Sequence, residues 1–224
     1  MTVCADAKPH FETLSHKLKG VYKSGAVDCR RTHEAIRFCR LLGVKSVELP
    51  LYGVVINGKT TFYRPETKSE DGIPMSDVED FADAQLPYEM VKEVTNLSYI
   101  KTILKTAQRE RKIGAVMVFN DSDRTSPLYA ILANRFRNDF KFGIDNKQNE
   151  SMKKAFNIKK YPMVVAYIPK PDNIKEYDTI VVDQPHKRDL GIWLEALAAK
   201  HEGSRPPEPA NSRKNRNKRT LKAY

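Results

Sequence analysis

The sequence predicts an α/β protein with two domains, each a mixed central sheet flanked by helices. Short β-branched or apolar runs alternate with amphipathic runs of helical spacing along most of the 224 residues. The order strand, helix, hairpin, helix then occurs twice along the chain. Residues 202–224 are basic and hold few apolar residues, so we expect a disordered tail there.

The first unit, residues 1–86, is predicted to run helix, strand, helix, hairpin, helix. Apolar spacing predicts helices over 8–19, 32–42 and 76–86. Ser76 and Glu79 have the spacing of a capping box that would open the third helix. Strands are predicted over 25–29, 51–56 and 60–63. Asn57-Gly58 predicts a two-residue hairpin turn, because both residues tolerate positive φ.

The second unit, residues 88–201, is predicted to run βαβαβαββα. Its strands are predicted over 91–95, 113–119, 140–144, 161–167 and 177–182. Its helices are predicted after the cap Asn96, over 126–138, over 149–156 and over 186–200. The run 113–119 is apolar throughout, which is typical of a strand buried on both faces.

The element order of the second unit is that of the thioredoxin fold, and the first unit has the same order without its start. In thioredoxins a Cys-x-x-Cys motif opens a helix, and a proline follows five residues after the second cysteine. Cys4 and Pro9 keep this spacing, but Met1 stands in place of the first cysteine, the nucleophile of dithiol exchange. We therefore expect two thioredoxin-like domains, the first truncated at its N-terminus, and no dithiol chemistry.

The second domain has no cysteine where the redox motif would stand, in residues 120–127. Asp121 and Asp123 lack the further ligands of a calcium loop, so a polar turn is the better interpretation. The other two cysteines, Cys29 and Cys39, are interpreted as small buried hydrophobic residues. Their spacing fits no zinc pattern, and neither a metal nor a cofactor is expected.

A proline opens the strand beside the active site in thioredoxin folds, with a cis peptide bond before it. The backbone there can pair with an extended peptide. The candidates are Pro50 in the first unit and Pro162, preceded by Tyr161, in the second. Tyr161 and Tyr167 are candidate aromatic contacts for a bound peptide, although the interpretation that we favour places both in the core.

Three N-glycosylation sequons occur, at Asn96, Asn120 and Asn149. A chain of this length holds about one by chance, so they are only candidates. Asn96 and Asn120 also resemble helix-cap or turn residues.

The formal net charge of +11 is concentrated at the C-terminus. Residues 201–224 hold seven Lys or Arg against two Glu, and no aromatic residues are interleaved to stack bases. We therefore expect no specific nucleic-acid binding, and a nucleic-acid-associated tail is kept as an alternative. No apolar run is long enough for a membrane span, and no signal peptide is visible.

Three stretches of the chain resemble the DnaJ subfamily C member sixteen family of endoplasmic-reticulum co-chaperones. They are 4–11 after the missing first cysteine, 56–62 on the hairpin and, most specifically, 86–99 at the junction of the two units. The J domain and the membrane anchor of that family are absent from this sequence. The resemblance covers the chain from Cys4 to about His201.

The resemblance implies a redox-inactive region of an endoplasmic-reticulum co-chaperone that binds client polypeptides or a protein partner. It also implies a link to autophagosome formation, and Hsp70 as a partner only if a J domain lies upstream. An alternative is a monothiol oxidoreductase that uses Cys4, since a helix N-terminus lowers a thiol pKa. We favour the redox-inactive binding region, and we therefore expect that the chain is not an enzyme.

Overall fold

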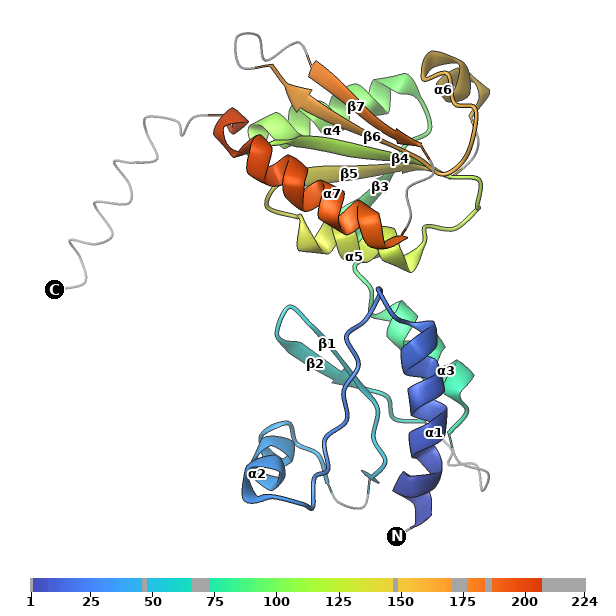
Figure 1. Ribbon diagram of the computed structural model, residues 1–224, viewed down its shortest axis with the longest axis vertical. Helices are drawn as coiled ribbons and strands as arrows, with labels where there is room; N and C mark the ends of the chain where they lie inside the picture. Colours follow the sequence, from blue (N-terminus) through green and yellow to red (C-terminus); the bar gives the residue numbers. More distant parts are fainter. Residues whose placement is uncertain are drawn as a thin grey trace, which may run out of the picture. The chain divides into compact units, whose positions relative to one another are not determined.

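The computed structural model describes residues 2–45, 48–65, 73–146, 149–170, 177–183 and 187–206. The chain divides into two compact units, Met1–Leu86 and Pro87–Tyr224, here called unit 1 and unit 2 (Figure 1). No helix in the described parts is long and apolar enough to cross a lipid bilayer.

Unit 1 contains three helices and one hairpin within its described residues. They are α1 (Thr2–Lys17), α2 (His33–Leu41), β1 (Gly53–Ile56), β2 (Lys59–Phe62) and α3 (Met75–Ala84). The hairpin turn is the predicted one, because Asn57 and Gly58 both have positive φ, at 52° and 79°. Thr32 caps α2 by accepting the N–H of Ala35, and Gly43, at φ 73°, follows its C-terminus.

Two local predictions for unit 1 are wrong. Residues 25–29 form no strand, because no described strand lies alongside to accept or donate ladder hydrogen bonds. The capping box at Ser76 is also absent. Pro74 precedes the first turn of α3, and the Ser76 hydroxyl donates to the carboxylate of Asp77 instead of capping the helix.

The core of unit 1 is small and lies between α1, α3 and the segment that enters the hairpin. Leu14, Tyr52 and Val78 are its buried members. The Tyr22 hydroxyl donates to the carbonyl of Ala82 at 2.7 Å and so ties the loop after α1 to α3. Burial and the nearby Asp83 carboxylate raise the pKa of Tyr22.

Unit 2 is built on one five-stranded sheet in the order β3-β5-β4-β6-β7. The strands are β3 (Val91–Glu93), β4 (Gly114–Phe119), β5 (Phe140–Asp145), β6 (Met163–Pro169) and β7 (Tyr177–Asp183). The first three are parallel, and β6 and β7 are antiparallel to their neighbours. The short 3-10 turn η2 (Tyr88–Met90) leads into β3.

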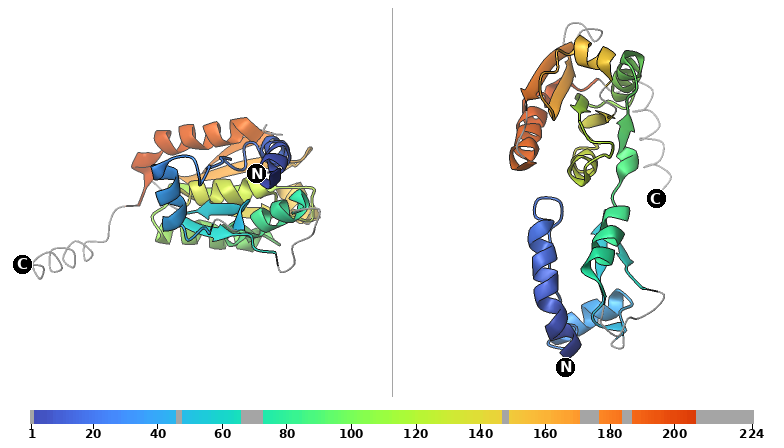
Figure 2. Two further views of the ribbon diagram at one scale, coloured as in Figure 1. Left: turned by 90° about the horizontal axis from the view of Figure 1, so that it is seen from below. Right: turned by 90° about the vertical axis from the view of Figure 1, so that its right-hand side faces the viewer.

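Helices cover both faces of this sheet (Figures 1 and 2). They are α4 (Leu97–Arg109), α5 (Pro127–Arg135), α6 (Glu150–Ala155) and α7 (Lys187–Lys200). One core cluster joins α5 and α7 to Val116 and Val118, and the other joins α4 and α6 to Ala115 and Met117. Successive residues of β4 therefore face opposite layers, and the whole strand is buried as its apolar sequence predicts.

The apolar residues of α4 and α7 lie mostly on the buried faces of the two helices. Ile100, Ile103, Leu104 and Ala107 are all buried on α4. The side chain of Asn96 caps that helix by accepting the N–H groups of Ser98 and Tyr99. On α7, Leu190, Leu194 and Leu197 are buried, whereas Ile192 lies on the outer side and is 65% exposed.

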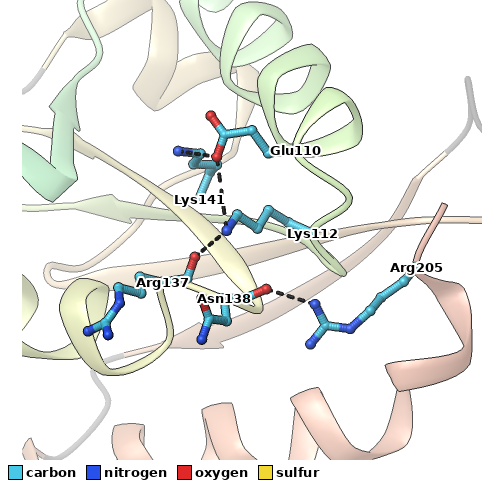
Figure 3. Close-up of polar contacts among 6 residues, drawn as sticks. All are labelled: Glu110, Lys112, Arg137, Asn138, Lys141 and Arg205. Carbon is cyan, nitrogen blue, oxygen red and sulfur yellow. Dashed lines mark hydrogen bonds and ion pairs between the residues drawn. The ribbon is translucent and has the colours of Figure 1, made fainter. Parts of the chain in front are cut away.

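The predicted tail begins later than expected, because residues 202–206 are held against unit 2. After the short 3-10 turn η3 (Glu202–Ser204), Arg205 donates to the carbonyl of Asn138 at 2.7 Å and pairs with Asp139. Figure 3 shows this contact beside Lys112, which donates to the carbonyl of Arg137. The rest of the predicted tail, 207–224, lies outside the described residues.

A second cluster in Figure 3 surrounds Lys112. Its ammonium lies 3.9 Å from the carboxylate of Glu110, which also pairs with Lys141 at 2.7 Å. Burial lowers the pKa of Lys112 although Glu110 acts in the opposite direction. These contacts join the end of α4 to the start of β5.

The hydroxyl of Tyr167 is buried and has no hydrogen-bond partner. Tyr167→Phe removes this hydroxyl and therefore measures how much free energy of unfolding its burial costs. Burial raises the pKa of Tyr167, so only the unfolded state ionises as pH rises past about 10. The contribution of Tyr167 to the free energy of unfolding is therefore fully present below about pH 10, and it is lost as the pH rises above about 10. Tyr167→Phe should raise the free energy of unfolding at pH 7 by about 1 kcal/mol and weaken the alkaline decline. Urea unfolding from pH 7 to 11 checks this prediction. Tyr99 is exposed, so the control Tyr99→Phe should change neither the free energy of unfolding at pH 7 nor its decline at alkaline pH.

Candidate functional site

Three buried polar residues of unit 2 gather where β4 and β5 end. Within the described residues, the buried polar or charged side chains are those of Asn120, Asp145 and Asn146, with 3–8% exposure. All three follow or end the parallel strands, at the carboxyl edge of the sheet. Ligands of open α/β sheets bind outside this edge. We call residues 120–126, 145–146 and 161–162 the carboxyl-edge site.

Hydrogen bonds between the two strand ends hold the loop of this site. The N–H of Asn120 donates to the carbonyl of Asp145 at 3.0 Å, and the Asn120 amide donates to the carbonyl of Arg124 at 3.5 Å. The Asn146 amide donates to the hydroxyl of Thr125 at 3.2 Å. The other side-chain atom of Asn146, Oδ1, is buried without a hydrogen-bond partner. The loop is therefore an ordered polar surface, and one buried acceptor in it is unsatisfied.

The loop leads directly into α5, as the sequence predicts. Pro127 occupies the first turn, and Ser126 precedes it without a side-chain capping bond. A redox motif would stand in this loop, but unit 2 contains no cysteine. Dithiol exchange by unit 2 itself is therefore excluded by composition.

Tyr161 and Pro162 lie beside this loop. The Tyr161–Pro162 bond is cis, as predicted, and Pro162 immediately precedes β6. Because Met163 pairs with Phe119, the strand entry lies next to the end of β4. Burial raises the pKa of Tyr161, and the charges of Lys153, Asp145, Glu150 and Asp121 also act on this pKa.

Tyr167, the other candidate contact, belongs to the core. It is 8% exposed and packs edge-on against Phe156, with 6.2 Å between ring centroids. Tyr167 pairs with Ala115, at the opposite end of β4 from the site. Tyr167 is therefore a core residue, and Tyr161 is partly buried against the same core cluster. A contact between Tyr161 and a bound peptide stays a prediction.

In unit 1 the predicted site residues Pro50 and Cys4 lie around Tyr52. The Leu49–Pro50 bond is cis, as predicted. Tyr52 is buried against Phe11, and burial together with the nearby Cys4 thiol raises the pKa of Tyr52. Cys4 is free and exposed on α1.

Cys29 and Cys39 form a disulfide, which corrects their interpretation as two independent hydrophobic residues. Their Cα atoms lie 5.8 Å apart, because the nine-residue segment between them folds α2 back against the preceding loop. Cys39 is buried, as expected, and Cys29 is partly exposed. The signal that was missed is a cysteine just before a helix, followed by one on the inner face of that helix.

The three sequons differ in how free their side chains are. Asn96 is exposed and uses Oδ1 to cap α4. Asn120 is buried in the carboxyl-edge site, and Asn149 caps α6 while its amide donates to the carbonyl of Thr95. Glycosylation of each remains a prediction. In the described ranges no group of three His, Cys, Asp or Glu side chains could hold a metal ion.

Comparison with known proteins agrees with this architecture. No family model matches the chain. A putative protein disulfide-isomerase of Dictyostelium discoideum is 24% identical over 164 residues, which are 73% of this chain and 38% of that protein. The crystal structure of ERdj5 form II superposes with a TM-score of 0.53 at 18% identity over 85% of this chain. The fold is thioredoxin-like.

Thioredoxin from Trypanosoma brucei brucei covers 51% of this chain at 15% identity, with a TM-score of 0.37. This chain spans 38% of its curated relative and 24% of the ERdj5 chain. The activities of those longer proteins are therefore not assigned to this thioredoxin-like chain by the similarity.

Proposed function

We propose that this chain is the client- or partner-binding region of a DnaJ-type co-chaperone of the endoplasmic reticulum, and that it is not itself an enzyme. The observation that carries the proposal is the carboxyl-edge site, an ordered polar loop beside Tyr161 in a complete thioredoxin-like sheet that has no cysteine. Such a site can bind a polypeptide but cannot exchange dithiols with it. The resemblance of residues 86–99 to the co-chaperone family supports the compartment and the class of partner.

The binding test compares Tyr161→Ala with the unchanged chain. We expect a reduced, carboxymethylated client polypeptide to bind the chain and Tyr161→Ala to weaken its Kd about tenfold, because an aromatic anchor is worth more than 1 kcal/mol. Fluorescence anisotropy of the labelled client measures the Kd. Ile192→Ala removes an exposed apolar side chain of the same unit outside the site, and it should leave the Kd unchanged. Equal weakening by both variants would refute a binding role for the carboxyl-edge site.

A second candidate function is monothiol oxidoreduction by Cys4, which the exposure of this free thiol favours. Cys4 would attack a client disulfide from its exposed position early in α1. Turbidity during insulin reduction separates the two functions. The binding proposal predicts no activity above the glutathione background, with or without Cys4→Ser. Activity that Cys4→Ser removes would establish the enzyme instead.

A further inference from the structure

Beside the Cys29–Cys39 disulfide of unit 1 lies a hollow of about 370 Å³. Its volume is in the range of small-molecule sites. The disulfide lines it together with the apolar side chains of Ile36 and Val44 and with two arginines, Arg30 and Arg40. All of these residues belong to one continuous stretch around α2, so the hollow lies within a single unit.

The lining of this hollow carries positive charge and no carboxylate. Three acidic side chains, Asp28, Glu34 and Glu48, lie near the lining residues in sequence, but none of them lines the hollow. Asp28 accepts the backbone N–H of Arg30 at 3.0 Å. Glu48 accepts the N–H of Lys45 and the guanidinium of Arg64, and these contacts lower the pKa of Glu48. Among the described residues neither Arg30 nor Arg40 forms an ion pair, so both guanidinium groups can bind a ligand carboxylate, which accepts two parallel hydrogen bonds from a guanidinium.

The two sulfur atoms of the disulfide differ in access. Cys39 is 5% exposed on the inner face of α2, whereas Cys29 is partly exposed in the loop before it. Thiol–disulfide exchange requires a thiolate to reach one sulfur while the other leaves as a thiolate. Attack at Cys29 satisfies both requirements, because the departing Cys39 thiolate shares the lining of the hollow with Arg30 and Arg40, and positive charge stabilises a thiolate.

We propose that this hollow binds a small anionic thiol, a cysteine-containing peptide with free carboxylates, and that the bound thiol reduces the Cys29–Cys39 disulfide. The ligand thiolate forms a bond to Cys29 Sγ as the Cys29–Cys39 bond breaks, and the electron pair goes to Cys39, which then takes a proton from water. A second ligand thiolate attacks the mixed disulfide and releases Cys29. Two ligand thiols are thereby oxidised to one disulfide, and the protein disulfide becomes two thiols.

The reduction has a structural consequence, because Cys39 is the buried side chain of α2. The buried members of the unit 1 core, Leu14, Tyr52 and Val78, all lie outside α2. Once the disulfide opens, little apolar contact holds the helix against the loop. This redox site is separate from the carboxyl-edge site and stands or falls independently of the binding function proposed above.

Glutathione and its diethyl ester test the proposal, since the ester keeps the thiol and blocks the carboxylates. The full chain carrying Cys4→Ser is mixed with each thiol, and the reaction is quenched in acid. Free thiols are then alkylated, and intact mass spectrometry measures the fraction of protein whose disulfide was reduced. Per unit of thiolate, we expect glutathione to reduce the disulfide about tenfold faster than the ester, because it adds charge-assisted contacts to two arginines. A mixed disulfide should map to Cys29.

Arginine variants decide whether the hollow is responsible. Arg30→Gln with Arg40→Gln should bring the glutathione-to-ester rate ratio close to one. Arg37 lies on the same helix but outside the hollow, so Arg37→Gln should leave the glutathione-to-ester rate ratio unchanged. Circular dichroism confirms that each variant is folded. Equal rates for the two thiols, no reduction by either of them, or a ratio that the double variant leaves intact would each overturn the proposal.

Discussion

Gly114→Ala is expected to lower the free energy of unfolding of unit 2 by about 3 kcal/mol or more. A Cβ at Gly114 would lie 2.1 Å from the backbone oxygen of Tyr167 and 3.1 Å from Cδ1 of Ile168. Gly114 begins β4, and its neighbour Ala115 pairs with Tyr167 across the sheet. The oxygen cannot retreat without separating β4 from β6, so the sheet itself must yield. Urea unfolding of the full chain, followed by far-ultraviolet circular dichroism, measures the loss.

Gly143→Ala is the matched control for this prediction. Its Cβ would also meet atoms closer than 3 Å, but these are Sδ and Cε of Met117 and Cδ1 of Ile103. The ends of flexible side chains can rotate away, so we expect a cost of about 1 kcal/mol. If the two substitutions cost the same, backbone proximity is not what makes Gly114 necessary.

The parts of the fold that the sequence predicted are those whose signals are local. The buried positions of α4 follow from spacing alone, and the Asn57-Gly58 turn follows from the φ values that these residues tolerate. The predicted strand at 25–29 failed because a strand exists only with a neighbour, and its own residues do not specify one.

Contacts between distant residues were the least predictable. Nothing near Arg205 in the sequence indicates that it will bind Asn138 and Asp139, so its segment was assigned to the tail by composition. The Cys29–Cys39 bond likewise depends on how the loop folds back onto α2.

The candidate site was only half predictable. The Tyr161–Pro162 step was inferred from topology, whereas the loop 120–126 was interpreted only as a polar turn, and the structure places the strand entry next to the end of β4 that leads into this loop. Asp145 and Asn146 were missed, because polar residues after a strand normally indicate an exposed turn. Their burial arises only when β5 is inserted between β3 and β4, a sheet order that the linear sequence does not state.

Phe119→Ala should destabilise unit 2 and, separately, weaken client binding. Phe119 is fully buried at the end of β4 and packs on Phe156, with 4.9 Å between ring centroids. Truncation leaves a cavity and should cost about 3–5 kcal/mol of the free energy of unfolding. Because the next residue is Asn120, the cavity also removes the support under the loop of the carboxyl-edge site.

Phe140 separates these two effects, since it is equally buried and also has an aromatic neighbour, Phe136. The pairing of Gly114 with Phe140 and of Phe119 with Asp145 places the two phenylalanines at opposite ends of adjacent parallel strands. Phe140→Ala should therefore cost a similar free energy of unfolding but leave the client Kd of the folded protein unchanged. The milder pair Phe119→Leu and Phe140→Leu keeps both chains folded for the Kd measurement. The two positions support opposite ends of the sheet and belong to different core clusters, Phe119 to that of α4 and α6 and Phe140 to that of α5 and α7. A Kd that responds to Phe119 alone would support binding at the carboxyl edge. An equal response at both positions would locate it elsewhere.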